Sequence, residues 1–152
     1  MKNKKDISLI DVENMKWGRD LKGLKLALQS NNDYIRKEAA EALRYIPGKE
    51  TIKCLCSILK DQFWAVRAIS IQSLAYIGEK NVIPYISDYL NDDSWVVRCS
   101  AIKALVKLGG NEVTDQILPF LFDEDAHVRN TTERLLDKLK DQESVILEDG
   151  IS

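Results

Sequence analysis

The 152-residue chain carries 22 Lys and Arg against 24 Asp and Glu, a formal net charge of −2, and 45% of its residues are hydrophobic, as in a globular protein. No apolar run approaches the roughly 20 residues of a membrane-spanning helix, and residues 1–6 are not followed by the apolar stretch of a secretion signal. Because Cys54, Cys56 and Cys99 show no pairing pattern, we expect reduced thiols and a cytoplasmic protein.

A fixed period divides the chain. It is set by four arginines spaced by 31 residues, since 67 − 36, 98 − 67 and 129 − 98 all give 31: Arg36, Arg67, Arg98 and Arg129. A period of this length is the signature of a stacked repeat protein.

The first elements in chain order form a degenerate cap, residues 1–31. Leu9, Val12 and Met15 fall in the apolar columns of later copies when shifted back by two periods. We therefore predict a first helix within residues 1–16, frayed before Asp6, and a second helix at residues 18–29. Terminal repeats are often atypical in this way.

Three full repeats follow, residues 32–62, 63–93 and 94–124, each with two antiparallel helices. Apolar residues recur at helical spacing, as in Val97, Ala101 and Leu105. The predicted helices cover residues 33–46 and 49–60, then 63–77 and 80–90, then 94–108 and 111–121. Glycines such as Gly78 mark their ends.

A C-terminal half repeat, residues 125–140, is predicted to hold one helix at 126–139. Residues 141–152 carry four acids and are predicted to be a mobile tail, with the alternative that Val145 to Leu147 dock as a short closing turn.

Helix starts are predicted from short polar side chains that accept amide hydrogen bonds. Asn32 or Asp33, Ser94 and Asp125 fit this role. Phe63 does not, so packing or Asp61 must hold that turn.

Columns that stay apolar predict the core, for example Leu43, Leu74, Leu105 and Leu136. A column of small residues marks the close approach of two helices: Ala39, Ser70, Ala101 and Thr132. Columns that change character are predicted to face water, among them Lys37, Ala68, Cys99 and Asn130.

The pattern Asp-x5-Arg with Val before the Arg, then small-x2-small-Leu-x2-Ile/Leu-Gly, resembles the short HEAT-like repeats, including those of the phycobilisome-lyase type. The resemblance covers about residues 17–140, and the tetratricopeptide and ankyrin signatures are missing. It implies an all-α fold, a right-handed α-solenoid (an armadillo-like superhelix) of stacked antiparallel helix hairpins with about four to five repeats.

The resemblance also implies a structural ladder, in which the Asp six residues before each Arg pairs with arginines of neighbouring repeats. The matching positions are Asp61/Arg67, Asp92/Arg98 and Asp123/Arg129, with Arg36 in a repeat that has Ser30 in place of Asp. A guanidinium suits this role because it offers several donors at fixed angles. We expect the ladder to weaken at Ser30.

No catalytic constellation is recognisable. The chain has one histidine, His127, predicted to lie exposed on a first helical turn, and no Cys-x2-Cys pair for a structural zinc ion. It lacks a phosphate-binding glycine loop, a nucleophile elbow and a dinucleotide fingerprint. We predict a protein that is not an enzyme and that has no cofactor and no metal.

By resemblance, the second helices line the concave face. The candidate partner-binding residues combine their outward side chains with two indoles, which are enriched in interface hot spots: Arg19, Lys22, Lys53, Ser57, Trp64, Tyr85, Asp88, Trp95, Asp115 and Gln116. Leu26, Cys54 and Glu112 are further outward positions. The alternative for Trp64 and Trp95 is that each indole packs across the turn onto the next repeat.

These observations predict a protein–protein interaction scaffold that binds a protein or peptide, as a monomer or weak oligomer. One alternative is a nucleic-acid module resembling DNA-alkylation-repeat proteins. It is disfavoured because only residues 1–60 are basic, with 13 Lys and Arg against 8 acids, whereas residues 61–152 have 9 against 16. A bilin-lyase-like maturation factor is the other alternative, carried by resemblance alone.

Overall fold

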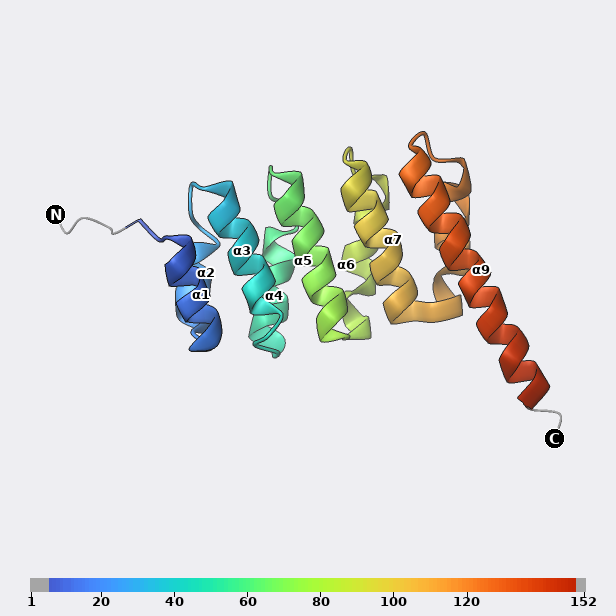
Figure 1. The fold of residues 1–152 in the computed structure, drawn as a ribbon, viewed down its shortest axis with the longest axis horizontal. Coiled ribbons are helices and arrows are strands. Elements are labelled where there is room, and N and C mark those ends of the chain that lie inside the picture. The colour runs from blue at the N-terminus through green and yellow to red at the C-terminus, as the bar shows by residue number, and fades with distance from the viewer. Residues whose placement is uncertain (1–5, 150–152) are drawn as a thin grey trace. The chain divides into compact units, whose positions relative to one another are not determined.

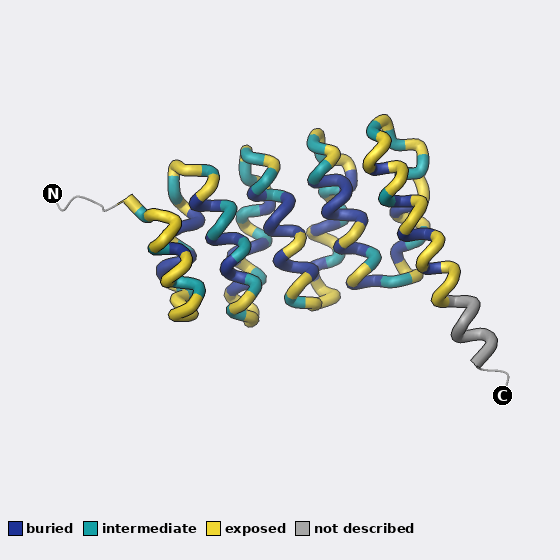
Figure 2. The backbone as a smooth tube through the Cα atoms, viewed as in Figure 1, coloured by how far each residue is buried: buried dark blue, intermediate teal, exposed yellow. Residues whose placement is uncertain are grey.

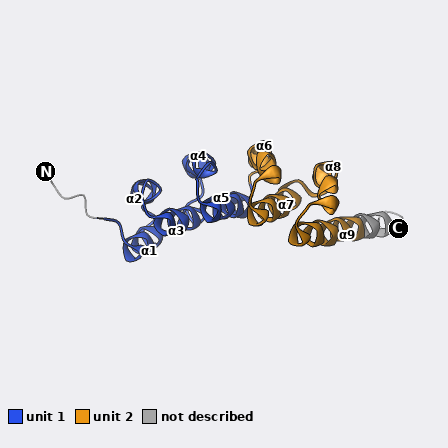
Figure 3. Ribbon diagram, turned by 90° about the horizontal axis from the view of Figure 1, so that it is seen from above, with its two compact units in different colours: residues 1–78 blue, residues 79–152 orange. Residues whose placement is uncertain are grey.

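The computed structural model describes the backbone of residues 6–149 and the side chains of residues 6–142. Within the described backbone every regular element is a helix, which confirms the predicted all-α class. The chain forms two compact units, Met1–Gly78 (unit 1) and Glu79–Ser152 (unit 2), coloured separately in Figure 3. The repeat pattern predicts one repeat domain over residues 1–152 and does not foresee this division.

Unit 1 contains two cap helices, α1 (Leu9–Trp17) and α2 (Leu21–Ala27), followed by α3 (Asp33–Leu43), α4 (Lys49–Ile58) and α5 (Trp64–Ile77). The first helices α1, α3 and α5 lie side by side in one row, and α2 and α4 lie in a second row (Figures 1 and 3). Side chains from both rows make the core: Leu24, Leu43, Leu55 and Leu74 are all 0% exposed.

Unit 2 begins with three short pieces, η1 (Lys80–Val82), α6 (Ile83–Ser87) and η2 (Asp88–Asn91), and continues with α7 (Trp95–Gly109). A second broken segment follows as η3 (Gly110–Val113), α8 (Thr114–Ile117) and η4 (Leu118–Phe122), and α9 (Ala126–Asp149) ends the unit. The long helices α7 and α9 pack against each other. Buried residues recur along the first helices in each unit, and in α7 all of Val97 to Ile102 are buried, so this helix is enclosed on most sides (Figure 2).

The prediction of one continuous α-helix at residues 80–90, and of another at residues 111–121, is wrong, although both segments are helical. Each is divided into short α and 3-10 pieces. Pro84 and Pro119 lie in the first positions of α6 and η4. Proline has no amide hydrogen to donate to a carbonyl one turn earlier, so it begins a helix more easily than it continues one.

The end predicted for the last helix at residue 139 is also wrong. Helix α9 runs to Asp149, so the predicted mobile tail is helical as far as the described backbone extends. The sequence explains the continuation, because neither glycine nor proline follows Ala126 until Gly150. The predicted docking of Val145 to Leu147 and the last residues, 150–152, lie outside the described side chains and backbone respectively.

The column of small residues is fully buried in both units, as expected for a close approach of helices: Ala39, Ser70, Ala101 and Thr132. Ser70 and Thr132 donate their hydroxyl hydrogens to carbonyls one turn back in their own helices, at 2.7 and 2.8 Å. Ala68 and Cys99 were predicted to face water and are instead 3% and 5% exposed. Cys99 Sγ lies 3.7 Å from Thr131 Oγ1 on α9. A small side chain in this repeat column can therefore be covered by the neighbouring first helix.

Helix starts follow the predicted chemistry in part. Asn32 accepts from the Tyr34 amide at 2.9 Å, and Asp125 accepts from the His127 amide at 2.8 Å. Ser94 makes no side-chain cap, contrary to prediction. Instead, Asp92 Oδ1 accepts from the Ser94 amide at 2.9 Å, a side-chain turn that precedes the helix, and α7 begins without a side-chain cap.

Candidate partner-binding surface

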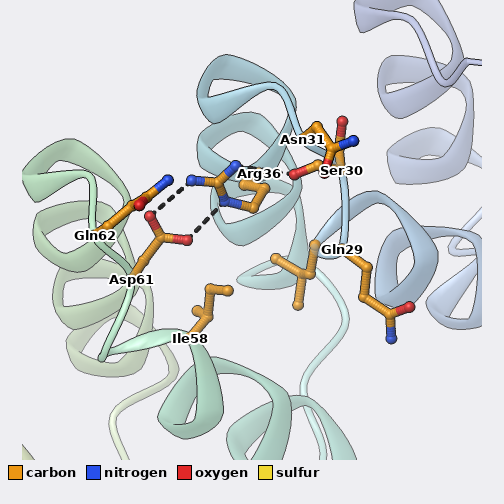
Figure 4. A pocket seen from close by; sticks show the side chains of 8 residues that line it. Gln29, Ser30, Asn31, Arg36, Ile58, Asp61 and Gln62 are labelled. Carbon is orange, nitrogen blue, oxygen red and sulfur yellow. Dashed lines mark hydrogen bonds and ion pairs between the residues drawn. The ribbon is translucent and has the colours of Figure 1, made fainter.

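The turn between α4 and α5 is held by an ion pair with α3, the first helix of the same predicted repeat. Arg36 on α3 donates from Nε and Nη2 to Asp61 Oδ2 and Oδ1 at 2.7 and 2.9 Å, a bidentate pair visible in Figure 4. Arg36 Nη1 also donates to the Ser30 carbonyl at 2.9 Å. Both charged side chains are more than nine-tenths buried. The pair therefore locks two successive turns together.

Unit 2 repeats this geometry. Arg98 donates from Nε and Nη2 to Asp123 at 2.9 and 2.8 Å and from Nη1 to the Asp92 carbonyl at 2.8 Å. The Asp123 backbone carbonyl accepts from Arg129 at 2.7 Å. Each carboxylate thus pairs with the arginine 25 residues earlier, while the arginine six residues later binds its backbone.

Ser30 changes the first of these turns without abolishing it. Its carbonyl accepts from Arg36 as other turn carbonyls do, and its hydroxyl accepts from the Asn32 amide at 3.2 Å. The Asp61 carboxylate accepts the equivalent amide hydrogen bond from Phe63 at 2.8 Å. What serine lacks is the negative charge that could pair with an arginine of a preceding repeat.

The buried pairs shift the ionisation of their members. Burial opposes ionisation of Asp61, but hydrogen bonds from Arg36 and the Phe63 amide outweigh it and lower the pKa of the carboxyl group. Asp123 behaves in the same way with Arg98 and the Asp125 amide, and its pKa is also lowered. The hydrogen bond to Asp61 raises the pKa of Arg36 in spite of burial. Both carboxylates are therefore held in their charged form.

We expect these carboxylates to make stability depend on pH. A folded pKa below the ordinary value of about 3.9 means that the stabilisation is complete above that value and is lost as pH falls through the lower folded pKa. Urea midpoints measured from about pH 7 to about pH 3 should fall more steeply for the unmodified chain than for Asp123→Asn. Parallel curves would show that the Asp123 charge is not responsible.

All ten predicted partner-binding residues are exposed in the structure. They divide between the units, which are considered separately: Arg19, Lys22, Lys53, Ser57 and Trp64 in unit 1, and Tyr85, Asp88, Trp95, Asp115 and Gln116 in unit 2. Cys54, expected to point outward, is only 9% exposed. Its thiol packs inward because the outward stripe of α4 passes through Lys53 and Ser57.

In each unit, polar contacts join successive second helices. Lys25 on α2 pairs with Glu50 on α4 at 2.5 Å, and Ser87 Oγ on α6 lies 3.0 Å from Gln116 Oε1 on α8. These contacts hold the second helices in register while leaving the neighbouring lysines and acids exposed to solvent.

The two candidate indoles have different surroundings. Trp95 stacks on the His127 ring of the next repeat, with centroids 4.4 Å apart and planes 19° apart. Trp64 packs against Phe63, which meets Tyr34 edge to face. Trp95 thus packs across the turn, the alternative considered from sequence, yet both indoles keep about two-fifths of their surface exposed.

Iodide is expected to quench all three indoles, because Trp17, Trp64 and Trp95 are 74%, 43% and 41% exposed. Chains that keep one tryptophan, with phenylalanine at the other two positions, would separate the contributions. Quenching constants should rank Trp17 above the other two. An indole protected as fully as in a folded core would remove it from the surface described here.

An aromatic and cationic cluster at the opposite ends of the unit 1 helices was missed by the sequence reasoning. Lys16 Nζ lies 5.2 Å from the Trp17 ring centroid and 5.0 Å from that of Tyr45. Tyr45 meets Tyr76 at 5.7 Å, and the Arg44 guanidinium lies over Tyr76 at 5.6 Å. The signal was available, since Tyr45 and Tyr76 occupy the same repeat column.

Reactive groups are few among the described side chains. All three cysteines are free thiols, and burial raises the pKa of Cys54 and Cys56. The described residues contain no group of three or more His, Cys, Asp or Glu side chains placed to hold a metal ion. A search of the described helices finds none with the length and apolar character needed to cross a membrane.

Helix hairpins that recur every 31 residues, with buried arginine–aspartate pairs at their turns, define a helical repeat protein of the α-solenoid class. The model of the HEAT repeats matches residues 21–93 and 55–137, and the chain belongs to this family. No curated protein matches it.

The solved structures that share the fold include two of low sequence identity to this chain. One is the complex of CpcE and CpcF of phycocyanin lyase from Nostoc sp. PCC7120, at 20% identity and a TM-score of 0.70. The match covers 90% of this chain and 61% of that chain, so this chain spans less than two-thirds of its relative. The other is an engineered protein, at 21% identity and a TM-score of 0.51, with 87% and 67% of the two chains covered.

Proposed function

We propose that this chain is a non-enzymatic scaffold that binds a protein or peptide partner through the outward side chains of its second helices. The observation that carries the proposal is the exposure of every candidate residue on these helices in both units. Stacked repeats commonly use such extended surfaces for binding. Free thiols on all three cysteines support a cytoplasmic location.

The similarity to phycocyanin lyase adds support for a protein partner, because the matched chain is solved in a complex of CpcE with CpcF. A lyase-like maturation role is the second candidate, favoured by that match. Co-purification of a pigment with this chain would distinguish it from a scaffold. Nucleic acid is the least supported partner, since residues 79–152 carry 8 Lys and Arg against 15 acids.

Site-specific photo-crosslinking in a lysate of the source cells would test the scaffold. A crosslinking residue at Ser57 on α4 or Tyr85 on α6 should capture a discrete protein, whereas one at Lys103, exposed on α7, should not. Equal capture from Lys103 would contradict a role for the second helices. A chain that captures no protein and retards DNA at low salt would contradict the scaffold itself.

A further inference from the structure

We propose that the second helices of unit 1 bind an acidic peptide segment that carries a bulky apolar side chain. The inference rests on the proposed scaffold function and names the class of partner for one unit.

Charge is the first observation. Residues 19–29 and 48–60, which contain α2 and α4, hold six Lys and Arg against two acids. The equivalent residues of unit 2, 79–91 and 110–122, hold one against four. Unit 1 therefore presents a positive helix surface in a chain whose net charge is negative, which is the complement of an acidic ligand.

These cations are available to a partner. Lys22 and Lys53 occupy the same position in successive repeats, and both are exposed. Neither they nor Arg19 form an ion pair with another described residue, whereas Lys25 is neutralised by Glu50. These charges thus form a row that crosses from one repeat to the next. Glu50 is the acid near Lys53, and the pKa of its carboxyl group is lowered first by the hydrogen bond from Lys25 and further by the charge of Lys53.

Arg19 is held at this surface by an unusual backbone. Its φ is 52°, in the left-handed region that favours glycine, where it closes the turn after α1. The Asp20 amide donates to the Met15 carbonyl at 2.8 Å and fixes this turn. A charged side chain therefore occupies a position whose conformation suits glycine better.

A cleft beside the row can receive an apolar side chain. It has a volume of about 570 Å³ and is lined by Asp6, Ile7, Leu26 and the polar residues 29–32, so one carboxylate lies at the cleft and the acids of a ligand must lie toward the lysines instead. Leu26 is one helical turn from Lys22 and is 51% exposed. An apolar ligand group in this cleft would cover Leu26 while acids one turn away reach Lys22.

A smaller pocket of about 390 Å³ adjoins the cleft, since both include Gln29, Ser30 and Asn31 (Figure 4). The side-chain amides of Gln29, Asn31 and Gln62 make no hydrogen bond to another described residue. They offer donors and acceptors of the kind that an extended peptide backbone requires.

A peptide fits this surface better than nucleic acid does. Single strands are bound by aromatic side chains that stack on bases along a basic track. Neither α2 nor α4 contains an aromatic residue. The cations span only two second helices, which provides little of the sustained basic track that phosphate contacts need.

Fluorescence anisotropy with a labelled peptide of glutamates around one leucine tests the proposal on the full chain. Lys22→Glu with Lys53→Glu should weaken binding roughly tenfold or more, and added salt should weaken binding to the unmodified chain. Lys103→Glu with Lys138→Glu is the matched control, because both pairs change the net charge from −2 to −6 on exposed lysines. Circular dichroism would verify that each variant is folded.

The apolar anchor has its own test. Leu26→Ser and replacement of the peptide leucine by serine should each weaken binding, and their combination should lose little more than either alone, as expected for two groups in contact.

Absence of peptide binding would overturn the proposal, as would equal losses for the two lysine pairs or equal binding of a lysine-based peptide. Tighter binding of a single-stranded oligonucleotide that Lys22→Glu and Lys53→Glu abolish would assign the surface to nucleic acid instead. If Ser57 crosslinks a protein while the acidic peptide fails to bind, the scaffold function stands and this inference falls.

Discussion

Asp123→Ala is expected to lower the free energy of unfolding by about 3–5 kcal/mol, the range observed when one member of a buried ion pair is removed. The substitution leaves the Arg98 guanidinium, whose side chain is 7% exposed, without its bidentate partner. The nearest remaining carboxylate is Glu124 at 3.5 Å, which is largely in solvent. The Asp125 amide also loses its acceptor at Asp123 Oδ1.

Urea unfolding followed by circular dichroism would measure the loss. Asp93→Ala is the control from the preceding turn, because Asp93 is exposed and its substitution should change stability by no more than about 0.5 kcal/mol. A second variant separates lost attraction from the cost of an unpaired charge. Arg98→Met with Asp123→Leu removes both charges and should be less destabilising than Asp123→Ala alone.

A double variant as unstable as Asp123→Ala would mean that the pair itself, and not the stranded guanidinium, holds the turn. A loss below about 1 kcal/mol for Asp123→Ala would place this contact among ordinary surface ion pairs.

The repeat period predicted the parts of the fold that depend on pattern alone. Leu43, Leu74 and Leu105 were assigned to the core because they recur every 31 residues, and all three are fully buried. Recurrence works here because each copy buries the same face against its neighbours. The same logic identified the arginines and aspartates at the turns.

What the period missed depends on single residues. Pro84 and Pro119 divide the second helices of unit 2, although their apolar spacing remains helical. The Asp61 carboxylate pairs with Arg36, which precedes it in the chain, whereas Arg67, which follows it, donates to the Asp61 backbone carbonyl. This choice depends on the distance between successive turns in three dimensions, which a sequence pattern does not contain.

The sequence predicted which side chains of the candidate surface are exposed, but it did not predict which residues they contact. Spacing placed Lys22, Lys53 and Tyr85 on the outward stripe of their helices, and they are exposed. Spacing raised the alternative that Trp95 packs onto the next repeat, but it did not identify His127 as the side chain that it stacks on. Nor could it reveal the cleft beside Leu26, which depends on how the segment around Ile7 returns to α2.

Leu105→Ala is expected to cost about 2–5 kcal/mol, the range for a leucine removed from a packed core. Leu105 is 0% exposed on α7, the helix that packs against α6 and α9 within unit 2. The cost combines lost burial of the side chain with the cavity that remains, because helices packed on both sides can only partly close it.

Trp95 reports this unit directly, so a chain with phenylalanine at Trp17 and Trp64 would follow the unfolding of unit 2 by fluorescence. Leu118→Ala is the matched control: it removes the same atoms from a side chain that is 46% exposed, and should shift the urea midpoint far less. Equal shifts for the two variants would contradict a core built on the repeating leucine column. A small shift of the urea midpoint for Leu105→Ala would show that α7 and its neighbours move to fill the cavity. Loosely stacked helices can do so, whereas closely packed helices cannot.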